Sequence, residues 1–238
     1  MDKFVLNEEI TPDYEDNNCM LFNYDCLEVL KELPNESIDL IVSDVPYHIV
    51  IVKRCSKKQG YPAKNQGKLF EHDSIKFEEY LPLIYEKLKD NSHCYLMINE
   101  KNLAKLQLEA EKVGFKFQQL IIWNKGNALP NHYYLRCYEC ILMLRKGRAK
   151  DINHMTTKNI IDIPNIKAGT KLHPTQKPVE LMKILIENSS NEGDVVCDMF
   201  MGAGSTGVAC IESNRKFIGC EIDLDFYTIA EDRIKCEV

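Results

Sequence analysis

The stretch Asp194–Asp223, DVVCDMFMGAGSTGVACIESNRKFIGCEID, decides the fold of this chain. It reads as a short apolar strand, a glycine turn, a helix and a second apolar strand, which we expect at residues 195–197, 202–204, 206–212 and 217–220. This order is typical of a nucleotide-binding half of a doubly wound sheet. The glycines let the backbone approach a ligand closely, and the start of the helix offers N–H groups there. Glu221, after the second strand, is placed to accept hydrogen bonds from both hydroxyls of a ribose.

The glycines also match the dinucleotide fingerprint, as Gly202-x-Gly204-x-x-Gly207, so an NAD-dependent oxidoreductase is one competing interpretation. A tight βα turn without any ligand is another. The position of the unit argues against NAD, because it begins near residue 194 of 238 and leaves too few residues for the rest of a dinucleotide domain. The other strands must come from earlier in the chain, in a circularly permuted order.

The remaining pattern predicts a single domain over residues 1–238. Apolar runs indicate strands at 20–22, 38–42, 93–98, 117–123 and 139–145, and helical spacing indicates helices at 26–33, 77–88, 101–113, 178–188 and 224–235. The last two of these strands are joined without a helix, which predicts antiparallel neighbours. The fold class is therefore α/β, a Rossmann-like, seven-stranded, mostly parallel sheet with helices on both faces and one antiparallel strand. Residues 1–18 are expected to be a surface arm, and residues 151–170 to be irregular.

The charge is unevenly distributed. The formal net charge of −6 does not by itself indicate a protein that binds nucleic acid. Six positive charges nevertheless fall in a window that has no acidic residue: Lys53, Arg54, Lys57, Lys58, Lys64 and Lys68. They lie in residues 52–72, an aperiodic stretch that is long for a loop. An acidic body with one basic loop fits a polyanion contacted at one place, and the alternative is a solvated, flexible loop.

The ten cysteines do not indicate a disulfide framework. Most lie inside apolar runs, as small core residues do in a reducing compartment. Cys137 and Cys140 form a C-x-x-C without a second pair, so we expect no metal site. There is no apolar leader and no run of membrane-spanning length. We therefore expect a cytoplasmic protein without a membrane partner.

The segment Asp44-Val45-Pro46-Tyr47 follows a buried strand and carries groups suited to holding a flat base with an amine. The Asp44 carboxylate can accept one amine hydrogen, and the Val45 carbonyl, restrained by the proline that follows, can accept the other. Tyr47 offers a face for stacking. Hydrogen bonds to both amine hydrogens localise the lone pair of the nitrogen. The nitrogen can then attack an electrophilic carbon in line. Read alone, the four residues would also fit a turn with a surface tyrosine.

These residues resemble the motifs of the S-adenosylmethionine-dependent amino-methyltransferases of nucleic acid, in the permuted arrangement called the β class. In that family a D-P-P-Y motif precedes an H-P-T-x-K-P segment, and an F-x-G-x-G loop lies near the C-terminus. The counterparts here are Asp44–Tyr47, His173–Pro178 and Phe200–Gly204, in the same order. The resemblance covers roughly residues 19–235 and accounts for the permutation. Val45 departs from the usual proline, which should preserve the chemistry of its carbonyl and loosen the loop.

The resemblance implies a role for each matching residue. Asp44, Val45, Pro46 and Tyr47 take the catalytic roles. Contacts with S-adenosylmethionine are implied for Asp25, Cys26, Asp44, Thr175, Lys177, Asp198, Phe200, Gly202, Gly204, Ser205, Thr206 and Glu221. In that set Glu221 meets the ribose, Asp25 and Cys26 meet the adenine ring, and Thr175 and Lys177 lie beside the methionine carboxylate. The basic loop is the expected contact with DNA.

The aspartate that opens the motif resembles the adenine-N6 subgroup, because serine usually stands there in the cytosine-N4 subgroup. The implied function is methylation of adenine N6 on a base flipped out of double-stranded DNA. Cytosine-N4 methylation and a catalytically silent nucleic-acid binder stay open. Only residues 146–171 separate the last strand from the H-P-T-x-K-P segment, which is a short stretch for recognising a DNA target. Recognition of the target should therefore also involve Asn124–Tyr138 and the basic loop. A homodimer and a restriction partner are left open.

Overall fold

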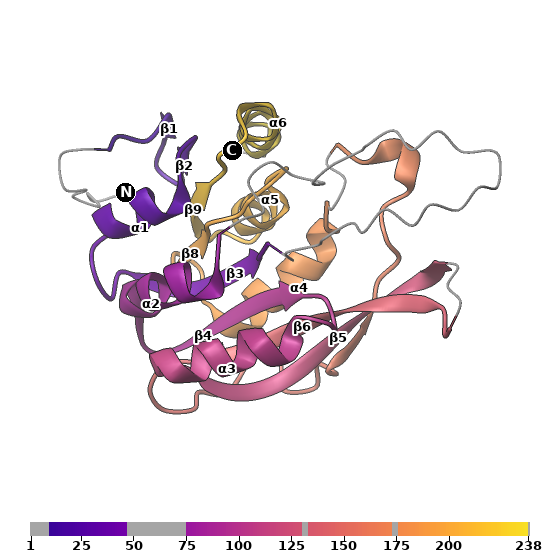
Figure 1. Cartoon of the computed structure of the whole chain (residues 1–238). Coiled ribbons are helices and arrows are strands. Elements are labelled where there is room, and N and C mark those ends of the chain that lie inside the picture. The colour runs from indigo at the N-terminus through magenta and orange to yellow at the C-terminus, as the bar shows by residue number, and fades with distance from the viewer. Residues whose placement is uncertain (1–9, 47–74, 130–132, 173–175, 238) are drawn as a thin grey trace, which may run out of the picture.

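The computed structural model describes residues 10–46, 75–129, 133–172 and 176–237. Within them the chain forms one nine-stranded sheet with helices on both faces (Figure 1). The strands are β1 (Tyr14–Glu15), β2 (Cys19–Phe22), β3 (Ile38–Asp44), β4 (Leu88–Ile98), β5 (Lys116–Leu129), β6 (Arg136–Arg145), β7 (Ile160–Asp162), β8 (Val195–Asp198) and β9 (Lys216–Cys220). The helices are α1 (Cys26–Glu32), α2 (Phe77–Lys87), α3 (Leu103–Val113), the short 3₁₀ helix η1 (Ala168–Thr170), α4 (Val179–Ser189), α5 (Ser205–Glu212) and α6 (Leu224–Lys235).

The sheet has the strand order β1-β2-β9-β8-β3-β4-β6-β5-β7. Strands β2, β9, β8, β3 and β4 run parallel to one another. Strand β6 is antiparallel to both β4 and β5, so β5 points in the same direction as β4. The expected fold class is confirmed, and so is the antiparallel pairing of the two strands that lack a helix between them.

The permuted order is visible in the pairing. Strands β8 and β9 come from the end of the chain, yet they lie between β2 and β3 in the middle of the sheet. Cys197 pairs with Ile41 of β3, and Gly219 pairs with Leu21 of β2. The strand–glycine turn–helix–strand unit therefore occupies the centre of the molecule, with the N-terminal strands on either side of it.

Two apolar cores fill the space between the sheet and the helices. One lies under α1, α2 and α3, and the other under α4, α5 and α6. Alternating side chains of β4 supply both, because successive residues of a strand point to opposite faces. Cys94 and Leu96 face the first core, whereas Tyr95 and Met97 face the second. None of the helices in the described ranges is long and apolar enough to cross a membrane.

The structure contains two short strands in addition to the seven that were predicted. Strand β1 pairs antiparallel with β2, inside the expected surface arm. Strand β7 pairs with β5, inside the segment that was expected to be irregular. That segment also contributes to the core, because Ile161 and Ile163 are buried and the Trp123 indole donates a 2.8 Å hydrogen bond to the Ile163 carbonyl. A strand of three residues gives too short an alternation to be detected from sequence.

The direction of the strands determines where chemistry can occur. The carboxyl ends of β2, β9, β8, β3, β4 and β5 all lie at one edge of the sheet, which we call the catalytic edge. Ligands of open α/β sheets bind outside this edge. Asp44 is the last residue of β3, Asp198 is the last of β8, and Glu221 directly follows β9.

Candidate active site

Glu221 connects the glycine turn to the end of β9 by hydrogen bonds. Its Oε2 accepts a 2.9 Å hydrogen bond from the Gly202 N–H, and its Oε1 accepts a 3.0 Å bond from the Asp223 N–H. Burial raises the pKa of this carboxyl above its ordinary value, against the effect of the two backbone bonds. Each oxygen accepts only one of these bonds and keeps acceptor capacity. Glu221 can therefore hold the turn and accept ribose hydroxyls at the same time.

Two glycines of the fingerprint serve packing. Gly204 has the left-handed φ of +73°, and a Cβ there would lie 3.0 Å from the Cβ of Ala230 in α6. A Cβ on Gly207 would collide with Ile234 of α6 and with Phe217 of β9. The sequence predicts that a ligand approaches Gly204 closely, and this stays a prediction. The structure adds that its missing side chain makes room for α6. Gly202, also left-handed at φ 51°, shapes the turn that Glu221 holds.

Asp198 is a buried carboxylate with three donors. Its Oδ1 accepts bonds from the Ser43 hydroxyl at 2.5 Å and from the Phe200 N–H at 3.1 Å. Its Oδ2 accepts a 2.6 Å bond from the Thr206 hydroxyl. Burial raises the pKa of Asp198 to about 6, although the three hydrogen bonds act in the opposite direction. The carboxylate thus joins β3, β8 and the first turn of α5.

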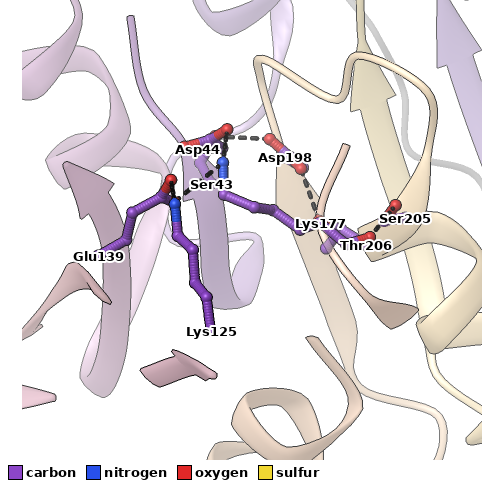
Figure 2. Close-up of polar contacts among 8 residues, drawn as sticks. All are labelled: Ser43, Asp44, Lys125, Glu139, Lys177, Asp198, Ser205 and Thr206. Carbon is purple, nitrogen blue, oxygen red and sulfur yellow. Dashed lines mark hydrogen bonds and ion pairs between the residues drawn. The ribbon is translucent and has the colours of Figure 1, made fainter. Parts of the chain in front are cut away.

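Lys177 carries the charge at the centre of the site (Figure 2). Its ammonium pairs with the Asp44 carboxylate and lies 3.4 Å from Oε2 of Glu139 on β6. Glu139 also pairs with Lys125 of β5. Only 4% of the Lys177 side chain is exposed. Burial disfavours its charge, but the two carboxylates outweigh that effect and raise its pKa, so Lys177 remains an ammonium at neutral pH.

The charges in this cluster alternate as Asp44, Lys177, Glu139 and Lys125, and Figure 2 shows them running from β3 across to β5 and β6. Burial tends to raise the pKa of Glu139, but the two lysines prevail and lower it. Lys171 lies close enough that the positive charges of Lys177 and Lys125 add to the effect of burial in lowering its pKa. Removing an inner member of this chain, Lys177 or Glu139, would take that charged partner away from both of its neighbours, which is costly.

Three residues of this site were missed from sequence: Ser43, Lys125 and Glu139. From sequence alone Ser43 has no assigned role, and Glu139 is only the first residue of the expected strand at 139–145 and a member of the C-x-x-C. Lys125 lies in a segment that was expected to take part in recognition. A usable indication existed for Glu139, which is the one acidic residue of β6 and directly precedes its apolar run 140–144. Its pairing with Lys177 depends on bringing residues 38 apart in sequence together, which no local pattern reveals.

Most of the predicted site residues that the structure describes meet at the catalytic edge. Ser205 donates a 2.9 Å hydrogen bond to the Lys177 carbonyl, so the H-P-T-x-K-P segment is attached to the glycine turn. Val45 is buried at 1% exposure, and Pro46 is half-buried. The Phe200 ring makes an edge contact with Tyr80, with 5.2 Å between ring centroids. Tyr47, Thr175 and the DNA-contact set Lys53, Arg54, Lys57, Lys58, Lys64 and Lys68 lie outside the described residues.

Asp25 and Cys26 have structural roles that the sequence did not predict. The Asp25 carboxylate accepts a 2.8 Å hydrogen bond from the Leu27 N–H and caps α1. Cys26 lies in the apolar core, where burial raises the pKa of its thiol to about 12. Both follow the end of β2, which places them at the catalytic edge beside Glu221. Their expected contact with an adenine ring remains a prediction.

The chemistry of the edge fits S-adenosylmethionine. Burial raises the pKa of both Asp198 and Glu221, so each carboxylate gains from hydrogen-bond donors or a nearby cation. A ribose supplies two hydroxyl donors, and a sulfonium supplies a positive charge without a proton. Ser205 and the first amides of α5 directly follow the glycine turn. The donor and acceptor set therefore matches this cofactor.

Known proteins share both the sequence pattern and the architecture. Residues 38–232 match a family model described as DNA methylase. The chain is 29% identical to Type II methyltransferase M2.DpnII of Streptococcus pneumoniae, over 95% of this chain and 93% of that protein. It is also 29% identical to DNA adenine methyltransferase YhdJ of Escherichia coli K12, over 88% of this chain and 80% of that protein. The crystal structure of the M1.HpyAVI–SAM complex superposes with a TM-score of 0.68 at 24% identity, covering 90% of this chain and 99% of that one. At this identity the superposition shows a common fold.

Proposed function

Since the chain belongs to the DNA methylase family, whose model spans residues 38–232, we propose that it transfers a methyl group from S-adenosylmethionine to the N6 amine of adenine in double-stranded DNA. The observation that carries this proposal is the arrangement at the ends of β3 and β8. Asp44 opens the D-V-P-Y motif, and the neighbouring Ser43 is bonded to Asp198, which in turn holds the glycine turn. The residues proposed to bind the base and those proposed to bind the cofactor are therefore one connected unit.

Asp44 accepts one hydrogen of the target amine. Its carboxylate has acceptor capacity beyond the bond to Lys177, so the ion pair and the amine can be accommodated together. The Val45 carbonyl accepts the second hydrogen, and Tyr47 stacks on the ring. These contacts localise the lone pair of the amine nitrogen. The cofactor supplies an electrophilic methyl group, and its positive sulfonium suits an edge that carries Asp44, Asp198 and Glu221.

Lys177 orients Asp44. Because the ammonium is buried and shared with Glu139, the Asp44 carboxylate is held in one direction before the base arrives. Electrostatic groups fixed in advance of the reaction stabilise developing charge without reorganising. Lys177 thereby contributes to catalysis as a positioning residue, in addition to the cofactor contact inferred from its motif.

The DNA must deliver an extruded base, since Asp44 cannot reach an amine inside the helical stack. The six positive charges of residues 53–68 follow the catalytic motif in sequence and supply phosphate contacts. Each phosphate neutralised adds about 0.9 to the slope of log affinity against log salt concentration. Replacing Lys53, Arg54, Lys57 and Lys58 with glutamine should flatten the slope and leave cofactor affinity unchanged.

The proposal is tested by expressing the protein in a host without adenine or cytosine-N4 methylation. Its DNA is then digested to nucleosides for mass spectrometry and sequenced for modified positions, with Asp44→Ala as the inactive control. N6-methyladenine at a defined site supports the proposal. N4-methylcytosine would assign the other amine chemistry instead. No methylated base, together with thermal stabilisation by NAD and none by S-adenosylhomocysteine, would overturn it in favour of an oxidoreductase. DNA binding without methylation would indicate a silent binder.

A further inference from the structure

The connection between β5 and β6 carries an exposed aromatic group. Tyr133 is 86% exposed, Tyr134 is 95% exposed, and Leu135 beside them is 58% exposed. Among the large apolar side chains of the described ranges, these tyrosines are the most exposed. We call Tyr133, Tyr134 and Leu135 the tyrosine tip. Adjacent apolar side chains that are this exposed mark interaction sites more often than isolated ones do.

The tyrosine tip belongs to the catalytic edge. Strand β5 ends there, and Leu129 pairs with Arg136 where β6 begins. Figure 1 shows the paired ends of β5 and β6 extending past the end of β3. The same hairpin supplies Glu139, which meets Lys177 and through it Asp44. Tyr134 precedes Glu139 by five residues, at most roughly 17 Å of extended chain. A molecule that places a base at Asp44 is therefore within reach of the tip.

The charge around the tip identifies the kind of partner. Residues 125–138 contain Lys125 and Arg136 and no acidic residue, although the chain as a whole carries −6. Residues 163–172 contain Lys167 and Lys171 and again no acidic residue. Lys125 and Lys177 are engaged in ion pairs with Glu139 and Asp44. Arg136 pairs with Glu100 at 2.8 Å, but both side chains are exposed, and a phosphate can replace such a partner. A second copy of this chain would bring two surfaces that carry Arg136, Lys167 and Lys171 together, because a two-fold interface joins like to like.

We propose that the tyrosine tip enters the DNA duplex beside the target and stacks on the partner base that is left unpaired when the target base is extruded. This inference rests on the proposed function and adds the element that keeps the base pair open. Opening a pair exposes the partner base, and every base has a face on which an aromatic ring can stack. Two tyrosines on one hairpin supply such rings beside the groups that receive the extruded base.

The test compares wild-type protein with the double variant Tyr133→Ala/Tyr134→Ala. The control is Leu108→Ala, which removes an exposed apolar side chain from α3, on the face of the sheet covered by α1 and α2. Dissociation constants are measured with labelled duplexes that carry the site found by sequencing. One duplex has the normal base pair. The other has an abasic site opposite the target, so no pair needs to be opened and no partner base is present.

The double variant should bind the normal duplex about 10- to 100-fold more weakly than wild type, as expected for lost base stacking. On the abasic duplex the difference should shrink to within about threefold. The control should match wild type on both, and S-adenosylhomocysteine should raise the Tm of all three proteins equally. Equal binding of the normal duplex by wild type and double variant would overturn the inference, as would an equal loss on both duplexes, which indicates a backbone contact. A wild-type dimer that the double variant dissociates would assign the tip to a second copy. Failure of wild type to methylate any DNA would instead refute the proposed function.

Discussion

The ammonium of Lys177 pairs with the carboxylate of Asp44, although the two residues come from segments 133 positions apart. Asp44 ends β3 and opens the D-V-P-Y motif. Asp44 is therefore already held by a charged partner when substrate arrives, and Glu139 shares that partner from strand β6, which lies beyond β4 in the sheet. Two residues from distant segments, Lys177 and Glu139, thus set the direction of the Asp44 carboxylate.

Asp44→Ala should abolish most methyl transfer and leave the protein folded. Lys177 keeps Glu139 at 3.4 Å, so its buried charge retains a partner. Loss of a fixed electrostatic group of this kind lowers kcat by about two to three orders of magnitude. Single-turnover methylation and calorimetric titration with S-adenosylhomocysteine provide the check. Activity within a few-fold of wild type would remove Asp44 from the catalytic group.

Lys177→Met should be more harmful to the fold than Asp44→Ala. The substitution leaves the carboxylates of Asp44 and Glu139 facing each other without their common cation. Breaking a buried ion pair by removing one partner typically costs about 3–5 kcal/mol. Urea unfolding measures the loss, and Lys183→Met, which removes a half-exposed lysine paired with Glu212, is the control. Equal stability of the two variants would contradict the buried network.

Glu139→Gln tests positioning through Lys177. The glutamine keeps the size of the side chain and removes its charge, so Lys177 should pair with Asp44 alone. We expect kcat to fall by about tenfold with little change in KM for the cofactor, and the low-pH limb of the kcat profile to shift. Glu139→Asp should recover part of the rate. Glu100→Gln, which removes an exposed acid at the same edge, should behave as wild type. If the variant has a lower Tm and this destabilisation explains all of its lower kcat, the role of Glu139 is purely structural.

Glu221→Gln should weaken cofactor binding. A glutamine has one acceptor oxygen, whereas Glu221 accepts the Gly202 and Asp223 N–H groups through different oxygens. The amide nitrogen must then face an N–H donor, which loosens the turn and removes a ribose acceptor. Leaving a donor unsatisfied costs roughly 1–3 kcal/mol, or about 5- to 150-fold in Kd. Calorimetry with S-adenosylhomocysteine measures it, with Glu212→Gln on α5 as the control. Gly204→Val is less informative, because its side chain would displace α6.

Much of this fold follows from local sequence. All seven predicted strands and all six predicted α-helices are present, because apolar periodicity and glycine turns act over a few residues. Strand β7 was missed because its three residues depend on β5 for their hydrogen bonds. The permuted order was predicted because the glycine unit stood too close to the end of the chain.

Some residues of the site could likewise be predicted from local sequence, and others could not. Asp44, Asp198 and Glu221 could be predicted, since each ends a strand or directly follows one. Glu139 and Lys125 could not, because their importance arises only when β6 places them next to Lys177. The packing function of Gly204 was likewise hidden, since it depends on where Ala230 lies.

Asp198→Asn should change how stability depends on pH. The folded state binds the proton of Asp198 more tightly than the unfolded state, because its pKa is about 6 rather than 3.8. Its contribution to stability is therefore largest in acid and is lost as pH rises from about 4 to about 6. Relative to the variant, the free energy of unfolding of the wild type should fall by roughly 3 kcal/mol across that window. Urea unfolding of both proteins at pH 4 to 7 measures the difference. A difference in unfolding free energy between the two proteins that does not change with pH would contradict the shifted pKa.

The central position of β8 and β9 has a consequence for synthesis on the ribosome. Strand β3 lacks its neighbour β8, and β2 lacks β9, until the last 45 residues of the chain have emerged. A nascent chain thus exposes unpaired strand edges for most of translation, and such edges can pair with other chains. The protein should depend on chaperones while it is being made, and stop codons near the C-terminus should yield aggregates rather than partially active fragments. The late arrival of the cofactor unit also means that no enzyme can form until the sheet is complete.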